Sequence, residues 1–168
     1  MTPPVFVLGL HPSARGLGWV LFEGADALFD CGSVEIHGSD KNGKALARVE
    51  RLLDKYRPAV LVLEDSDGKA SRRKPRLRRL YRSLITRAQR HGVAVHLYAR
   101  GEITDALGLA DGGRRHDVAA VVAERVEALR PRLPRPQKIW LGESHHMGLF
   151  CAAACVLTHY AREVASAE

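Results

Sequence analysis

The uninterrupted apolar run at residues 59–64, AVLVLE, constrains the fold of this chain more than any other segment. Polar and apolar residues do not alternate along it, so both faces of a strand formed here would be apolar. Such a strand must be covered on both sides, which is typical of a central strand in a parallel sheet. Segments with helical spacing flank the run at residues 44–56 and 76–91 and would supply the cover. The run therefore predicts an α/β fold.

The remaining segments predict the order of the elements. Short apolar runs predict strands at residues 4–10, 19–24 and 28–36, and the turn residues 13–16 predict a hairpin between the first two. After residue 64 the patterns predict an exposed loop at 65–75, a helix at 76–91, a strand at 93–98, and helices at 100–108, 114–129 and about 144–164. This order, β-β-β-α-β-α-β-α-α-α, predicts a mixed five-stranded sheet that begins with a three-strand meander and carries helices on both faces. The chain has 168 residues and no linker-like segment, so we expect a single domain over residues 1–168.

Composition narrows the classes of function. Lys and Arg number 26 against 19 Asp and Glu, and the resulting net charge of +7 favours a polyanionic partner. The three cysteines, Cys31, Cys151 and Cys155, form no CxxC pair, and their odd number argues against a disulfide framework. We therefore expect a reducing, cytoplasmic setting. The N-terminus does not resemble a signal peptide and no apolar stretch reaches ~18 residues, so no membrane association is expected.

A basic segment at residues 69–90 is the most pronounced local charge feature. No acid occurs between Asp67 and Glu102. The cations of this segment would repel one another unless a polyanion, or acids from elsewhere in the fold, neutralise them, so we expect phosphate binding. Tyr81 lies within the segment and would either stack on a base or pack inward. The expected nucleic-acid contacts in this segment are Arg72, Arg73, Lys74, Arg76, Arg78, Arg79 and Arg82.

Four segments, taken in order, share a pattern with one known family of nucleases. They are Gly9–Val20 (GLHPSARGLGWV), Glu64 at the end of the fourth strand, Tyr98–Ile103 (YARGEI) followed by Arg114 and Arg115, and Cys151–His159 (CAAACVLTH). In this order they resemble the RuvC-type Holliday-junction nucleases of the ribonuclease H-like superfamily, over nearly the whole chain. The resemblance implies a ribonuclease H-like fold and an endonuclease that acts on branched DNA with a divalent metal, Mg²⁺ or Mn²⁺. It also implies a homodimer, and nucleic-acid contacts by Arg114 and Arg115.

The departures from this family fall on the acids that the resemblance assigns to metal binding. Those acids belong at positions 11, 64, 148 and 151, but only Glu64 is an acid, and the others are His11, Gly148 and Cys151. Mg²⁺ prefers hard oxygen ligands, whereas imidazole and thiolate suit Zn²⁺ or another borderline ion. A shifted register of the last helix would instead bring Glu143 and His146 to the site, but it loses the match at Thr158 and His159, so we prefer the ungapped register. The candidate catalytic residues are Glu64, His11, Cys151, Glu143 and His146, and the candidate metal ligands are Glu64, His11 and His146.

These candidates also have purely structural interpretations. A neutral imidazole bonded to the backbone explains His11 slightly better than a metal ligand does, and burial as small apolar side chains explains Cys151 and Cys155 better than metal binding. Glu143, His145 and His146 are equally explained by the electrostatics of a helix start and by a role in acid–base chemistry or metal binding. Glu64 favours a functional interpretation, because acids rarely end a fully apolar strand without a partner.

Three classes of function remain open. The chain is a nucleic-acid-binding relative with an altered and impaired metal site, an active metal-dependent endonuclease that uses Glu64, Glu143 and His146, or a structural and assembly partner. We favour the first, in which a bound metal is not required. A sugar kinase or another ATPase of the related actin-like fold is disfavoured, because the chain is short and lacks a second glycine-rich phosphate loop. If the resemblance holds, His11, Glu64 and the start of the last helix should converge in one cleft at the carboxyl ends of the strands.

Overall fold

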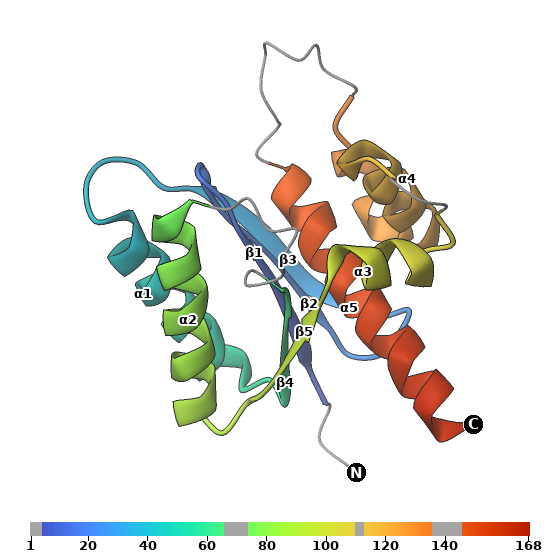
Figure 1. Cartoon of the computed structure of the whole chain (residues 1–168), viewed down its shortest axis with the longest axis horizontal. Coiled ribbons are helices and arrows are strands. Elements are labelled where there is room, and N and C mark those ends of the chain that lie inside the picture. Colours follow the sequence, from blue (N-terminus) through green and yellow to red (C-terminus); the bar gives the residue numbers. More distant parts are fainter. Residues whose placement is uncertain (1–4, 66–73, 110–112, 136–145) are drawn as a thin grey trace.

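A mixed five-stranded sheet with the order β3-β2-β1-β4-β5 forms the centre of the molecule (Figure 1). The computed structural model describes residues 5–65, 74–109, 113–135 and 146–168. The strands are β1 Val7–Pro12, β2 Gly16–Phe22, β3 Leu28–Glu35, β4 Val60–Glu64 and β5 Ala94–Tyr98. The first three pair in antiparallel fashion, whereas β4 runs parallel to both β1 and β5. The expected meander, mixed sheet and central β4 are therefore confirmed.

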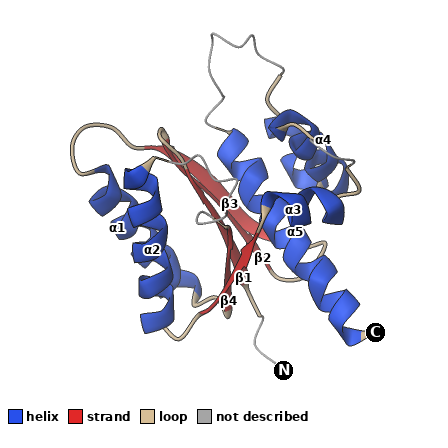
Figure 2. Ribbon diagram, viewed as in Figure 1, coloured by secondary structure: helices blue, strands red, loops and turns tan. Residues whose placement is uncertain are grey.

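Helices cover both faces of this sheet, as the apolar run in β4 requires (Figure 2). Helices α1 (Lys41–Tyr56) and α2 (Pro75–Arg90) lie on one face, and α3 (Arg100–Ala106), α4 (Arg115–Arg125) and α5 (Met147–Ala167) lie on the other. Alternate residues of each strand enter one of two cores. Leu8 and Leu10 pack with the α1–α2 layer, and Val7 and Val62 pack with the α5 layer.

The helix expected at residues 114–129 is shorter than predicted. Helix α4 ends at Arg125, and a 3₁₀ helix, η1 (Glu127–Arg132), follows it. The guanidinium of Arg130 donates to the carbonyls of Ala123 (3.0 Å) and Glu124 (3.2 Å), and so satisfies acceptors that a continuing α-helix would have used. Apolar periodicity continues through both elements, which is why the sequence pattern did not locate the break.

Helix α5 crosses the sheet as the main support of the second core. All of the residues expected to face inward, Leu149, Ala152, Ala153, Val156 and Leu157, are buried. Of the two orientations left open for Tyr81 in α2, the structure shows the inward one, since its side chain is fully buried. In the part of the chain that the structure describes, no helix combines the length and the apolarity needed to cross a bilayer.

Candidate functional site

His11 lies near the carboxyl end of β1, on the side of the sheet that faces α5. Its neighbour on the same face, Gly9, is pressed so closely against α5 that a Cβ there would lie 2.7 Å from the carbonyl oxygen of Ala152. Because alternate residues of a strand share a face, His11 points to α5 as well. Its side chain is only 4% exposed. The imidazole is therefore held between the sheet and the first turn of α5.

Two glycines bring that first turn against the sheet. Gly18 pairs with His11 across the β1–β2 ladder, and a Cβ on Gly18 would lie 2.3 Å from the carbonyl carbon of Gly148. A Cβ on Gly148 would lie 3.6 Å from Cδ2 of His11. Position 148 is one of those at which the resemblance expects an acid, and the structure places it beside position 11.

Glu64 ends β4 next to His11. The parallel pairing of β1 and β4 joins Val7 to Val60 and Gly9 to Val62, where the ladder ends. His11 and Glu64 each lie two residues beyond its last pair, so both follow the ladder at the carboxyl ends of the two strands. Neighbouring strands lie about 4.8 Å apart, and residues in register on parallel strands share a face. Glu64 is half-buried, and it also pairs in register with Tyr98 of β5. The structure thus places His11 against Gly148, and it places Glu64 at the same carboxyl edge, on the strand next to β1.

The other candidates are distributed unevenly around this edge. His146 is half-buried and immediately precedes α5. Cys151, 5% exposed, lies one helical turn after Gly148, and Cys155 is fully enclosed in the core one turn later. Glu143, His145, Arg72 and Arg73 lie outside the described residues. The shifted register, which depends on Glu143, therefore stays a prediction.

The described residues at the positions where the resemblance expects acids do not fit a pair of Mg²⁺ ions. Of the positions at which the resemblance expects acids, only 64 carries a carboxylate, while 148 has no side chain at all. Two Mg²⁺ ions need several hard oxygen ligands and negative charge to offset their own. An imidazole, a thiol and one carboxylate provide neither.

The cations of the basic segment on α2 differ in their exposure, and two of them are bonded to α1. Arg76 Nη1 donates to Asn42 Oδ1 (2.8 Å) and Arg87 Nη1 to Glu50 Oε1 (2.7 Å), so both guanidinium groups are bonded to α1. One acid from elsewhere in the fold, Glu50, therefore neutralises Arg87, whereas the partner of Arg76 is a neutral amide. Arg78 is half-buried. The exposed cations among those expected to contact nucleic acid are Lys74, Arg79, Arg82, Arg114 and Arg115.

A buried polar relay that the sequence analysis did not identify connects α5 to the end of β5. The hydroxyl of Tyr98 and Nδ1 of His159 are 2.9 Å apart, and Nε2 of His159 lies 3.4 Å from Glu163 Oε1. Burial lowers the pKa of His159 and raises the pKa of Tyr98. The only sequence feature that pointed to His159 was its place in the Thr158–His159 match.

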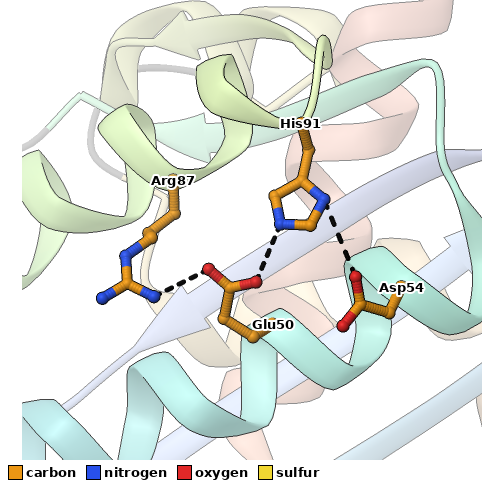
Figure 3. A network of polar contacts seen from close by, with 4 residues as sticks. All are labelled: Glu50, Asp54, Arg87 and His91. Atoms are coloured by element: carbon orange, nitrogen blue, oxygen red, sulfur yellow. Dashed lines mark hydrogen bonds and ion pairs between the residues drawn. The ribbon is translucent and has the colours of Figure 1, made fainter.

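A cluster of Glu50, Asp54 and His91 is the group of described residues with the spacing of metal ligands, its ligand atoms lying within 4.8 Å of one another (Figure 3). It lies away from His11 and Glu64, because the ends of α1 and α2 lead into the starts of β4 and β5, at the opposite edge of the sheet. Both oxygens of Glu50 are already engaged, one with Arg87 and one with His91 at 2.7 Å. These two contacts lower the pKa of Glu50, with the hydrogen bond from Arg87 as the largest cause. The cluster is therefore a brace between α1 and α2.

Comparison with known proteins places this fold among solved structures. No family model matches the sequence, and no curated protein matches it. The RuvC of Thermus thermophilus superposes with a TM-score of 0.72 at 21% identity, covering 96% of this chain and 97% of that one. The T. thermophilus RuvC in complex with a Holliday junction substrate superposes with a TM-score of 0.70 at 22% identity, and 96% of each chain is covered. The yeast mitochondrial Holliday junction resolvase Ydc2 gives 0.56 at 11% identity, over 99% of this chain and 82% of that one. The chain has the ribonuclease H-like fold of the RuvC-type Holliday-junction resolvases.

Proposed function

We propose that this protein binds branched DNA at the carboxyl edge of its sheet and that its Mg²⁺-dependent cleavage is impaired. One observation carries the proposal. His11 lies against Gly148 at the carboxyl edge where Glu64 also lies, and the resemblance expects acids at positions 11 and 148. The fold supports the class of ligand, since one of the structures it resembles is a RuvC with a Holliday junction substrate. The altered donor set supports the loss of Mg²⁺ chemistry.

Exposed cations at the same edge support the binding half of the proposal. Helix α2 lies between the parallel strands β4 and β5 and leads into the start of β5, so it begins at the edge where β4 ends. Lys74, Arg79 and Arg82 lie at its N-cap and in its first turns. Phosphate contacts by such side chains supply affinity through release of counterions, which makes binding weaken steeply with salt.

Binding is tested by fluorescence anisotropy with a four-way junction and a linear duplex built from the same strands, without divalent metal. We expect tighter binding of the junction, and for the variant Arg79→Ala/Arg82→Ala a loss of roughly tenfold with a salt slope lower by about 2. The control Arg125→Ala/Arg135→Ala removes the same charge from exposed positions on and after α4 and should bind like the wild type. Equal affinity for both DNAs, or equal losses in both variants, would refute the proposed interface.

Cleavage is tested separately with the same junction in Mg²⁺ or Mn²⁺. We expect little or no product from the unmodified protein. Robust cleavage that Glu64→Ala abolishes would overturn the impaired site and point to a ligand set of Glu64, Glu143 and His146.

We further propose that the protein works as a single-domain homodimer in the cytoplasm. The dimer rests on the resemblance and on the two-fold symmetry of a four-way junction, which a symmetric pair of subunits would match. The cytoplasmic setting rests on Cys31, Cys151 and Cys155, all of which have free thiols. Sedimentation with and without junction DNA measures the oligomeric state.

A further inference from the structure

Helix α1 carries a continuous stripe of cations along its whole length. The stripe consists of Lys41, Lys44, Arg48, Arg51 and Lys55. Their spacing of three, four, three and four residues places all of them on one face of an α-helix. Lys44, Arg48, Arg51 and Lys55 are exposed, and Lys41 is half-buried. This α1 stripe lies outside the basic segment of residues 69–90.

The acids of α1 are turned away from the stripe. With 3.6 residues per turn, Glu50 and Asp54 lie about 100–140° around the helix axis from the centre of the stripe. They face α2, where Glu50 pairs with Arg87 and His91, and Asp54 Oδ1 lies 3.9 Å from His91 (Figure 3). The acids of α1 thus contact residues of and after α2. They do not neutralise the positive charge of the stripe, which lies on another side of the helix.

No carboxylate of the described chain forms an ion pair with any member of the stripe. Lys41 Nζ donates to the carbonyl of Ala14 (3.2 Å), and Lys44 Nζ donates to the carbonyl of His37 (2.7 Å). These acceptors are neutral, so they orient the ammonium groups without neutralising them. Like charges held in one row repel, which favours a polyanion as the partner of this face.

The stripe borders an open groove between α1 and the segment that follows β3. The groove has a volume of about 390 Å³, and Lys44, Arg48 and Arg51 line it from α1. Glu35 and His37 line the other side, and their side chains lie 3.2 Å apart, so the acid of the groove has a local partner. A row of cations along one wall of an open groove suits an extended phosphate backbone better than a small enclosed ligand.

The stripe also begins at the same end of the sheet as the candidate site, on the opposite face. β3 runs parallel to β1, because each is antiparallel to β2, so α1 starts at the sheet edge where His11 lies. The hydrogen bond from Lys41 to Ala14 joins the first turn of α1 to the turn after β1. From Lys41 to Lys55 the helix rises about 21 Å, the length of roughly six base pairs of duplex.

We infer that the α1 stripe is a second backbone-binding track, which holds one duplex arm of a branched DNA as that arm runs away from the candidate site. The inference rests on the proposed function and extends it with a separate surface. The arm is bound through its phosphates, so the track contributes affinity and arm direction and carries no base specificity. Lys44, Arg48 and Arg51 form its central part.

The test compares wild type with Lys44→Ala/Arg48→Ala/Arg51→Ala, whose exposed positions leave the core unchanged. For a four-way junction at about 0.1 M salt we expect affinity to fall about 10- to 100-fold and the salt slope to fall by roughly 2–3. Hydroxyl-radical footprints should lose protection along one arm and keep it near the branch point. The matched control Arg125→Ala/Arg135→Ala/Arg162→Ala removes three exposed cations, from α4, from the segment after η1 and from α5, and should change affinity less than about threefold.

Three outcomes separate this inference from the proposed function. If wild type binds no DNA, both fail. If Arg79→Ala/Arg82→Ala loses junction binding while the stripe variant keeps wild-type affinity and footprint, only the α1 track fails. The third outcome concerns vesicles of phosphatidylserine. If wild type binds them and the stripe variant does not, while the variant keeps its DNA binding, the stripe is a membrane contact and the inference is overturned.

Discussion

Gly18 allows the close approach of α5 to the sheet at the candidate site. A Cβ at Gly18 would lie 2.3 Å from the carbonyl carbon of Gly148 and 2.6 Å from the backbone nitrogen of Leu149. Backbone atoms cannot rotate away as the end of a side chain can, so the first turn of α5 would have to move. A Cβ at Gly148 would meet nothing closer than 3.5 Å, so the close approach depends on Gly18, while the glycine at 148 leaves that position without the acid that the resemblance expects.

Gly18→Ala should therefore destabilise the protein, by about 3 kcal/mol from the cost of overpacking. Chemical denaturation measures the free energy of unfolding. Gly101→Ala in α3 is the matched control, because its Cβ would meet nothing within 4 Å, and it should be neutral or stabilising by up to about 1 kcal/mol. Equal effects of the two changes would contradict the close approach of α5.

Single residues could be predicted from the sequence when their neighbours in the chain defined them. Glu64 followed from the apolar strand it ends, and His11 from its matched turn. The engagement of Arg76 and Arg87 could not be predicted, because their partners, Asn42 and Glu50, lie on another helix. The sequence shows how many cations follow one another along the chain. How many of them are paired depends on residues from other elements of the fold.

Element boundaries followed from the sequence where local chemistry marked them, as at the end of α1, which falls at Tyr56, two residues before Pro58. Boundaries did not follow from the sequence where a side chain from another element ends the helix. The end of α4 depends on Arg130, which lies in the next element and caps α4 from there. The relay of Tyr98, His159 and Glu163 likewise joins β5 to α5 through contacts that no local pattern encodes.

This relay should make the attachment of α5 sensitive to pH. Burial lowers the pKa of His159, Glu163 opposes this effect, and His96 adds to it. The unfolded chain therefore binds more protons than the folded one once the pH falls below about 6.5, so stability is full above that pH and decreases as the pH drops. His159→Gln should flatten the dependence between pH 7.5 and 5.5, where one proton contributes at most about 1.4 kcal/mol per pH unit.

The measurement is the free energy of unfolding at several pH values in that range. His37→Gln is the control, because it removes a histidine whose side chain is 81% exposed. If His159→Gln and wild type lose stability in parallel on acidification, His159 does not carry the effect.

At the scale of the whole molecule, the candidate site joins segments from both ends of the chain. β1 and α5 are more than 130 residues apart in sequence, and β4 lies between them. The layer order, the central strand and the two covered faces could be predicted, because each element buries a face that its own pattern reveals. The side chains that lie at the carboxyl edge could not be predicted in the same way. They depend on the register between β1 and β4 and on the position of α5 on the sheet, and tertiary packing sets both.

The same assembly predicts what would restore a metal site. In His11→Asp/Cys151→Asp, two new carboxylates join Glu64 at the edge where β1, β4 and α5 meet. Without metal these partly buried charges should destabilise the protein, because they repel one another and lose solvation. Mn²⁺ should reverse this, since an ion that binds only the folded state stabilises it by about 2.7 kcal/mol at 100 times its dissociation constant. For a chain of 168 residues that corresponds to a rise in Tm of roughly 5–10 °C.

Thermal unfolding with increasing Mn²⁺ measures the shift without requiring cleavage. The wild type should respond little, because one carboxylate, an imidazole and a thiol do not suit the ion. Adding Glu64→Ala to the double variant is the decisive control, since it removes the ligand from β4 and leaves the Glu50, Asp54 and His91 cluster intact. A shift that survives Glu64→Ala would mean that Mn²⁺ binds elsewhere. The absence of any shift would mean that the three positions do not meet closely enough to hold an ion.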